Sequence, residues 1–335
     1  MKRLTDRSGQ ILLSVNEPRQ KTRGRGNLTP LLWPYFLASF FPVSSLCQST
    51  NVPIYQGLAF DDNVVNLFQA LLLGVLQGAT EFLPVSSSGH LVLVPWLLDW
   101  PASGLAFDAV VHWGTALAVV AYFWRDWVVL VGAAFRSLRQ RSLADADARL
   151  AWFILLGTLP GALAGWLLED FFEGMFARPV AAAAFLLVTA ALLTASERLG
   201  RRQRDLHALA WPDVLLIGLA QALAILPGIS RSGATIAAGL ARGLRRGDAA
   251  RFSFLLATPI ILGAGLLQVV DLAQVGDLAA QAPVLLVGFL SAGVVGFGCI
   301  HFLLRYLQRR RLYPFALYCV AVGLACLLVA LVRGM

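Results

Sequence analysis

The chain has 335 residues, of which 58% are hydrophobic and only 14% are charged. Soluble domains carry about 25% charged residues, so this composition excludes an ordinary soluble domain and predicts an integral membrane protein. The net charge of +8 at pH 7 comes from arginines that stand in short blocks between apolar stretches. Cytoplasmic loops of membrane proteins have this pattern, and we therefore do not expect nucleic acid as a partner.

Residues 1–60 form an N-terminal extension that is first basic and then apolar. Residues 1–29 are polar and basic, whereas residues 31–47 are apolar but contain Pro34 and Pro42. A signal-anchor helix with a basic cytoplasmic flank is one interpretation. An unstructured tail, or a start codon assigned too early, is another, and the sequence leaves these alternatives open.

Residues 63–335 are expected to form the membrane domain. About 20 apolar residues cross a bilayer, and six stretches are long enough: residues 106–124, 151–168, 179–196, 252–270, 284–304 and 314–332. Two further apolar regions, residues 64–98 and 212–241, are broken near the middle by Pro, Gly and Ser. Broken backbone is tolerated in a membrane only where protein or water shelters it. We therefore predict an all-α, multi-pass membrane protein with two re-entrant helix–loop–helix hairpins.

Charges in the loops support this arrangement. Arginines concentrate between the first and second predicted spans, on both sides of the second hairpin, and between the fifth and sixth spans, whereas acidic residues dominate the loops between them. This alternation requires six spans and two hairpins that do not cross. The hairpins then enter from opposite faces and make an inverted repeat, whose tips are expected to meet near the bilayer midplane.

The two hairpins carry related polar loops. When Gln77 is placed over Gln221, the same spacing pairs three further positions: Ser86 with Ser230, Ser88 with Ser232, and Gly89 with Gly233. Between the matched serines stands Ser87 in the first loop and Arg231 in the second. Such polar side chains are costly in hydrocarbon and are functional candidates for that reason. We predict that the two loops form one composite site that binds and attacks an anion.

The first loop holds candidate reactive groups. Gln77 and Glu81 are four residues apart and so share one face of a helix. Carboxylate and amide oxygens are ligands for Mg²⁺ or Ca²⁺, but a single carboxylate needs water or substrate oxygens to complete the shell of a metal ion. The run Ser86–Ser88 precedes a helix, where hydroxyls and N–H groups bind anions or simply cap the helix. His90 is a candidate general acid or base.

In the second loop, Arg231 is the main candidate. A guanidinium at a hairpin tip within a bilayer must find an anion, and its fork geometry suits phosphate. The residues expected to contact the substrate around it are Ser86, Ser88, Ser230, Ser232, Gly233 and Thr235. Asp108, at the start of the first span, is either a second acid near the site or an ordinary helix-start carboxylate. We interpret His112, His207 and His301, which have no evident companions, as structural or loop residues.

Residues 77–91 (QGATEFLPVSSSGHL) resemble the first signature of the undecaprenyl-diphosphate phosphatases, also called bacitracin-resistance proteins. Residues 227–235 (PGISRSGAT) are similar to the second signature, and residues 107–115 are similar to part of the stretch between them. The resemblance covers roughly residues 63–335 and leaves residues 1–60 outside.

This resemblance implies a hydrolase of the bacterial inner membrane that converts undecaprenyl diphosphate to undecaprenyl phosphate, recycles the lipid carrier of peptidoglycan synthesis and confers bacitracin resistance. It implies dependence on a divalent cation, Mg²⁺ or Ca²⁺. It also implies roles for four residues: Ser87 as nucleophile, Glu81 as the acid that activates it or helps to hold the metal, His90 as the catalytic histidine, and Arg231 as the phosphate clamp. The family has Glu or Gln at position 77, and Gln77 weakens the case for a charged metal ligand there.

A transporter or flippase of a polyprenyl phosphate is the alternative, because inverted repeats with broken helices are typical of secondary transporters. We favour an enzyme, because one loop combines a nucleophile, a carboxylate and a histidine. Two mechanisms stay open: attack by Ser87 to give a phosphoserine, or direct attack by metal-activated water with Ser87 as a ligand. The expected partners are a polyprenyl diphosphate lipid and the membrane, and a homodimer is compatible with the sequence.

Overall fold

The computed structural model describes residues 65–101, 103–272 and 278–335; the prediction for residues 1–60 lies outside them. Within these residues the fold consists of helices joined by short loops. The helices are α2 (Leu67–Phe82), α3 (Ser87–Leu98), α4 (Leu105–Tyr122), α5 (Trp124–Gln140), α6 (Ala146–Leu167), α7 (Glu169–Phe176), α8 (Pro179–Leu199), the short η2 (Leu206–Ala208), α9 (Trp211–Leu223), α10 (Arg231–Ala241), α11 (Arg246–Leu272), α12 (Leu278–Leu307) and α13 (Tyr313–Val332). The predicted all-α class is confirmed.

Four of the described helices are long and apolar enough to cross a membrane: α6, α8, α12 and α13. Helices α4 and α5, which are bent by 76° at the break between them, give a fifth if the pair is counted as one span. The multi-pass prediction is therefore confirmed. The remaining predicted span, residues 252–270, lies within α11, which is not among the described helices that meet this test. The number of six spans stays a prediction.

Helix α5 was not expected. The basic segment after the first predicted span forms α5 rather than a loop. Its buried residues, Leu130, Ala133 and Ser137, recur at helical spacing, and α5 packs against α6. Because the other faces of α5 carry arginines, the segment reads as a polar loop when only its charge is considered.

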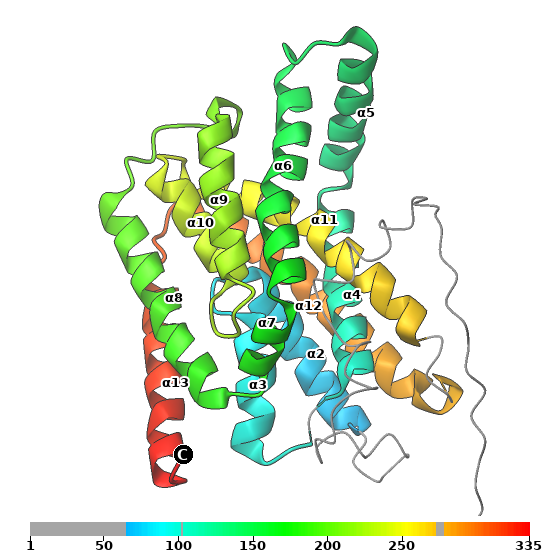
Figure 1. Ribbon diagram of the computed structural model, residues 1–335, viewed down its shortest axis with the longest axis vertical. Coiled ribbons are helices and arrows are strands. Elements are labelled where there is room, and N and C mark those ends of the chain that lie inside the picture. Colours follow the sequence, from blue (N-terminus) through cyan, green and yellow to red (C-terminus); the bar gives the residue numbers. More distant parts are fainter. Residues whose placement is uncertain (1–64, 102, 273–277) are drawn as a thin grey trace, which may run out of the picture. The chain divides into compact units, whose positions relative to one another are not determined.

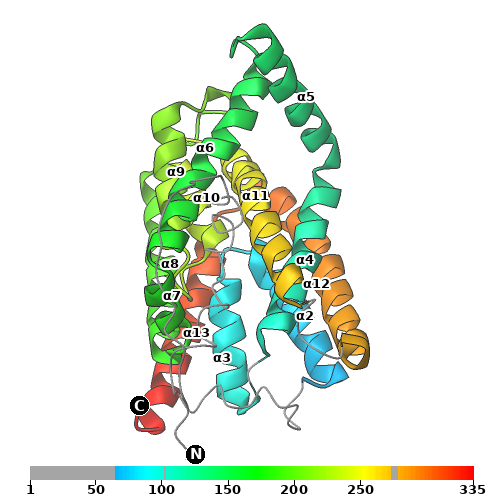
Figure 2. The same cartoon turned by 45° about the vertical axis from the view of Figure 1, so that its right-hand side comes forward.

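The two predicted hairpins, residues 64–98 and 212–241, are confirmed as the pairs α2–α3 and α9–α10. Their helices have 16, 12, 13 and 11 residues, which is shorter than the roughly 20 residues that cross a bilayer. Figures 1 and 2 show the α2–α3 hairpin opening toward one end of the view and the α9–α10 hairpin toward the other, with their loops between. The hydroxyl of Ser232 donates to the carbonyl of Leu83 at 3.1 Å, so the tips are in direct contact.

The return helix of each hairpin begins in the same way. Ser86 Oγ accepts a hydrogen bond from the Gly89 amide at 3.2 Å, and Ser230 Oγ accepts one from the Gly233 amide at 3.0 Å. Matched serines therefore cap matched helices, as N-cap serines commonly do. Ser86 adopts a φ of 74°, which is uncommon for a residue other than glycine and is frequent at functional sites.

Matched glycines also allow both hairpins to pack closely on a long helix. A Cβ atom at Gly74 of α2 would lie 2.6 Å from the carbonyl oxygen of Gly288 on α12. At Gly218 of α9, which has the same spacing from Gly74 as Gln221 has from Gln77, it would lie 2.6 Å from the carbonyl oxygen of Gly157 on α6. The two halves thus use the same close backbone approach to fix the hairpins.

Helix α8 holds the second tip in place and packs against both return helices, α3 and α10. Thr189 Oγ1 donates to the carbonyl of Gly228 at 2.9 Å and accepts from the amide of Ser230 at 2.9 Å. Gly228 has a φ of 98°, and a Cβ atom there would lie 2.1 Å from the carbonyl oxygen of Ala182. The turn before Arg231 is therefore fixed by a buried threonine and by the absence of a side chain at Gly228.

We predict that Gly218→Ala destabilises the protein, because the added methyl group would clash with a backbone carbonyl that cannot rotate away. Overpacking of this kind costs about 1–3 kcal/mol. The measurement is the midpoint of thermal unfolding in detergent, which should fall by several degrees. Gly247→Ala is the matched control, since a Cβ atom at that helical position would meet no atom within 4 Å. Equal midpoints for the two variants would contradict the packing account.

Candidate active site

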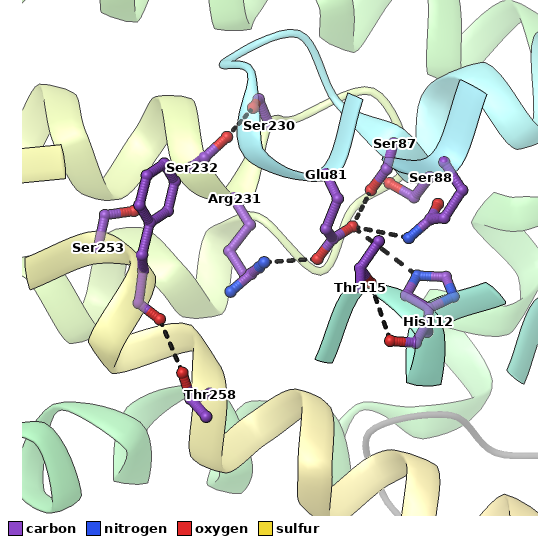
Figure 3. Close-up of polar contacts among 12 residues, drawn as sticks. Glu81, Ser87, Ser88, His112, Thr115, Ser230, Arg231, Ser232, Ser253 and Thr258 are labelled. Carbon is purple, nitrogen blue, oxygen red and sulfur yellow. Dashed lines mark hydrogen bonds and ion pairs between the residues drawn. The ribbon is translucent and has the colours of Figure 1, made fainter. Parts of the chain in front are cut away.

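The carboxylate of Glu81 joins the two hairpin tips. Its Oε1 accepts a hydrogen bond from Nη2 of Arg231 at 2.5 Å, and its Oε2 accepts one from Oγ of Ser87 at 2.5 Å. Figure 3 shows both side chains directed at this one carboxylate from opposite hairpins. Ser87 and Arg231, which the sequence analysis expected to converge, therefore contact the same carboxylate; their roles in one functional site stay a prediction.

Two helix N-termini meet at this carboxylate. Ser87 is the first residue of α3, and Arg231 is the first residue of α10. A helix N-terminus carries a partial positive charge and unpaired N–H groups, and it binds phosphate well for that reason. The helices α3 and α10 thus add to the positive potential of the guanidinium, as the predicted anion site requires.

Exposure differs among the members of the cluster. Glu81 is buried, with 4% of its side chain exposed, whereas 18% of the Arg231 side chain is accessible. Ser87 and Ser88 are also partly exposed. An incoming anion can therefore reach the hydroxyls and the guanidinium, while the carboxylate behind them is shielded from solvent.

Gln77 completes one side of the cluster. It is fully buried, and its Nε2 donates to Glu81 Oε2 at 3.0 Å. Its Oε1 is buried and has no hydrogen-bond partner among the described residues. A buried polar atom without a partner is costly and calls for an explanation. A cation beside Glu81 would provide one, because amide and carboxylate oxygens are suitable ligands for Mg²⁺ or Ca²⁺.

The protein alone offers few ligands for such a cation. The described residues include no group of three or more His, Cys, Asp and Glu side chains that could hold a metal ion. The oxygens of Gln77 and Glu81 therefore fit a cation only if water or substrate phosphate completes its shell, and the cation stays a prediction.

His112 was missed by the sequence analysis. We interpreted it as structural, but its Nε2 lies 4.0 Å from Oε2 of Glu81, at the edge of the cluster (Figure 3). Its Nδ1 lies 2.7 Å from the carbonyl of Asp108, and Ser103 donates to the Asp108 carboxylate at 2.6 Å. The only sequence signal was that His112 falls within residues 107–115, which resemble the family between its two signatures.

His90 points to a different part of the protein. It is buried, and its Nδ1 lies 2.7 Å from the carbonyl of Ser86. Its Nε2 lies 2.8 Å from the hydroxyl of Tyr318 on α13. Both ring nitrogens are thus engaged outside the Glu81 cluster, and a catalytic role for His90 stays a prediction.

The residues predicted to bind substrate mostly hold the tips together. Ser86 and Ser230 cap their helices, as described above, and Gly233 supplies the capped amide in the second hairpin. A Cβ atom at Gly233 would lie 2.9 Å from the Cβ of Ser230, so this cap requires glycine. For Ser86 and Ser230, the helix-capping interpretation describes the observed hydrogen bonds.

The other three differ in exposure. Ser232 is buried and donates to the first tip, and Thr235 is buried and donates to the carbonyl of Arg231 at 2.7 Å. Thr235 also shares a hydrogen bond of 2.6 Å with Ser253 of α11. Ser88, in contrast, is partly exposed and lies 3.4 Å from the hydroxyl of Ser86. Direct substrate contact by these residues stays a prediction, and Ser88 has the most accessible hydroxyl among them.

Comparison with known proteins matches this sequence to one family. The sequence pattern of the bacitracin resistance protein BacA family matches residues 70–325, which include both hairpins. A protein of Thermomicrobium roseum named undecaprenyl-diphosphatase is 47% identical over 273 residues, 79% of this chain and 98% of the relative. A relative of the same name from Pelotomaculum thermopropionicum is 45% identical over 80% of this chain and 98% of the relative. Another, from Rubrobacter xylanophilus, is 47% identical over 80% of this chain and 99% of the relative. The chain belongs to the bacitracin resistance protein BacA family.

Proposed function

We propose that this membrane protein is an undecaprenyl-diphosphatase, which hydrolyses undecaprenyl diphosphate to undecaprenyl phosphate and inorganic phosphate in the bacterial inner membrane. This activity regenerates the lipid carrier of cell-wall synthesis and gives resistance to bacitracin. The observation that carries the proposal is the hydrogen bond of 2.5 Å between Ser87 and Glu81, with Arg231 on the other carboxylate oxygen. The names of the relatives support the choice of substrate.

Ser87 and Glu81 are arranged as a nucleophile and its base. A base within hydrogen-bond reach activates a hydroxyl that would otherwise be a weak nucleophile. As Ser87 Oγ attacks the terminal phosphorus, its proton passes to Glu81 Oε2. The bond from the terminal phosphorus to the bridging oxygen breaks, and undecaprenyl phosphate leaves with the electron pair. Glu81 gives the proton to the departing undecaprenyl phosphate and is again a carboxylate. Water then attacks the phosphoserine, Glu81 accepts the proton of the water and returns it to Ser87 Oγ as the bond from Oγ to phosphorus breaks, and inorganic phosphate leaves.

The proposed role of Arg231 is to neutralise charge on the transferred phosphoryl group. Phosphoryl transfer depends mainly on positioning and on stabilisation of the equatorial oxygens. A guanidinium has five N–H donors, and within the described residues the side chain of Arg231 uses Nη2 to bind Glu81. The remaining donors are available for the diphosphate. Attachment to Glu81 fixes the guanidinium beside the nucleophile before substrate arrives.

The proposed cofactor is a divalent cation, Mg²⁺ or Ca²⁺. Glu81 and the unpartnered oxygen of Gln77 would hold it, together with oxygens of water or substrate. When bound, the cation would neutralise part of the charge of the diphosphate.

The arrangement favours a hydrolase over a transporter of the same lipid. A transporter needs groups that bind the phosphate, such as Arg231, but a base hydrogen-bonded to a hydroxyl contributes nothing to release of an unchanged substrate. Partial exposure of Ser87 and Arg231 lets the diphosphate enter while the prenyl chain stays in lipid. A homodimer remains a prediction.

We expect Ser87→Ala to lower phosphate release from undecaprenyl diphosphate by at least about 100-fold, because loss of both nucleophile and base contact removes the covalent route. Acid quenching of the wild-type reaction during turnover, followed by peptide mass spectrometry, should locate phosphate on Ser87. Ser88→Ala is the matched control and should retain the phosphoserine. Full turnover by Ser87→Ala would rule out this route and leave attack by activated water.

For Arg231→Ala we predict near-total loss of activity. Arg231→Lys should retain a small fraction, because lysine keeps the charge but lacks the planar fork. Both variants should be assayed for phosphate release in detergent, with elution profile and thermal midpoint as measures of folding. Activity within a few-fold of wild type in folded Arg231→Ala would contradict the assigned role.

The cation can be tested with the same purified protein. A chelator should abolish phosphate release, and Mg²⁺ or Ca²⁺ should restore it. Gln77→Ala should raise the cation concentration that gives half-maximal activity, because one oxygen ligand is lost, whereas Gln77→Glu should lower it. Detergent solution has no separate compartments, so phosphate release there also distinguishes hydrolysis from transport. Cation requirements that are identical in wild type and both variants would remove Gln77 from the proposed site.

A further inference from the structure

A groove remote from the Glu81 cluster follows the C-terminal end of α12. Its volume is about 460 Å³, and its lining runs from Gly298 through Phe302 to Arg305, Arg309 and Arg310. None of the residues of the proposed catalytic cluster lines it. The lining changes from apolar to strongly basic along the helix, which suits a ligand with an apolar chain and an anionic head.

The apolar part of the groove is open. A Cβ atom at Gly298 would meet no atom within 4 Å, and half of the surface of Phe302 is exposed. His301, which also lines the groove and is exposed, contacts the hydroxyl of Tyr122 on α4 at 3.2 Å through Nδ1. An acyl chain could therefore lie along α12 without displacing a side chain that is packed in the core.

The basic part has no internal counter-charge. Several described arginines near the ends of helices bind a carboxylate of the protein: Arg202 and Arg246 pair with Glu197, Arg204 and Arg242 with Asp213, Arg251 with Asp126, and Arg333 with Asp99. Arg305, Arg309 and Arg310 are exposed, and no described carboxylate forms an ion pair with any of them. Three guanidiniums at one end of a membrane helix thus remain available to an external anion.

The backbone that carries these arginines is held in place. The amide of Arg310 donates to the carbonyl of Tyr306 at 2.9 Å, and the Tyr306 hydroxyl donates to the carbonyl of Arg311 at 3.2 Å. The next amide, that of Leu312, donates to the buried carboxylate of Glu197 at 2.9 Å. A fixed backbone lowers the entropy lost when a ligand binds, and this turn is fixed at both sides of the arginines.

We propose that this groove binds an anionic glycerophospholipid of the cytoplasmic leaflet. The arginine block between the fifth and sixth predicted spans belongs to the cytoplasmic side by the charge rule, where anionic lipids bind basic pockets beside membrane helices. The phosphate lies between Arg305, Arg309 and Arg310, and an acyl chain follows Gly298 and Phe302. Because α12 packs on α2 and α4, the bound lipid supports the helix on which the first hairpin rests.

The test is native mass spectrometry of the full chain in detergent with added dioleoyl phosphatidylglycerol or dioleoyl phosphatidylcholine. Wild type should retain phosphatidylglycerol preferentially. The triple variant Arg305→Gln, Arg309→Gln, Arg310→Gln should lose this preference by on the order of 100-fold, since each arginine near an anionic lipid contributes a factor of about five. Arg198→Gln with Arg201→Gln is the matched control, because both arginines are exposed and neither lines the groove; it should keep the preference.

Gly298→Phe is a second, independent variant, because it fills the apolar end and leaves every arginine in place. It should reduce phosphatidylglycerol retention at least tenfold, while phosphate release in detergent stays at the wild-type level in this variant and in the triple variant. Three results would overturn the proposal: an unchanged preference in both variants, full displacement of the lipid by inorganic phosphate, or a lipid-free dimer that the triple variant dissociates. Displacement by one equivalent of undecaprenyl phosphate would assign the groove to the reaction product instead.

Discussion

The buried carboxylate of Glu81, whose charge requires a partner of opposite charge, determines how the two halves of this protein meet. An unpaired charge in a low-dielectric interior costs several kcal/mol, and Glu81 is almost fully buried. Its charge is balanced by Arg231, which stands at the tip of the opposite hairpin, and its second oxygen is bonded to Ser87. The contact that stabilises the paired tips is therefore also the contact that brings together the proposed nucleophile, the proposed base and the proposed phosphate clamp.

The inverted repeat positions the two hairpins. The proposed reactive residues stand at positions where the two repeats differ. Matched serines cap the return helices and matched glycines seat the hairpins on long helices. At the spacing that pairs these residues, Glu81 corresponds to Ile225, Ser87 to Arg231 and His90 to Ala234. One tip thus carries the acid and the hydroxyl, and the other carries the cation. A symmetrical pair of tips would place like charges together, whereas this division of residues makes them attract.

Much of this arrangement could be predicted from sequence because its signals are local or periodic. Apolar length, breaks by Pro and Gly, and alternating loop charge located both hairpins, and the cost of polar groups in a membrane singled out Glu81, Ser87 and Arg231. Two features could not be predicted in this way. His112 of α4 lies near Glu81 of α2. This contact joins two different helices, so the sequence spacing of the two residues does not predict it. Helix α5 has a narrow buried face, and its other faces carry arginines. Its charge pattern alone therefore predicts a loop and not a helix.

The proposed mechanism requires a single diphosphate to lie between the two tips. The measurement that tests this requirement most directly is a structure of the purified protein bound to a polyprenyl diphosphate analogue in which a methylene group replaces the bridging oxygen. The protein is held in lipid nanodiscs with a divalent cation. The account predicts a terminal phosphorus about 3–3.5 Å from Ser87 Oγ, as near-attack geometry requires, with its oxygens hydrogen-bonded to the guanidinium of Arg231. A phosphonate bound with full occupancy away from either residue would contradict it.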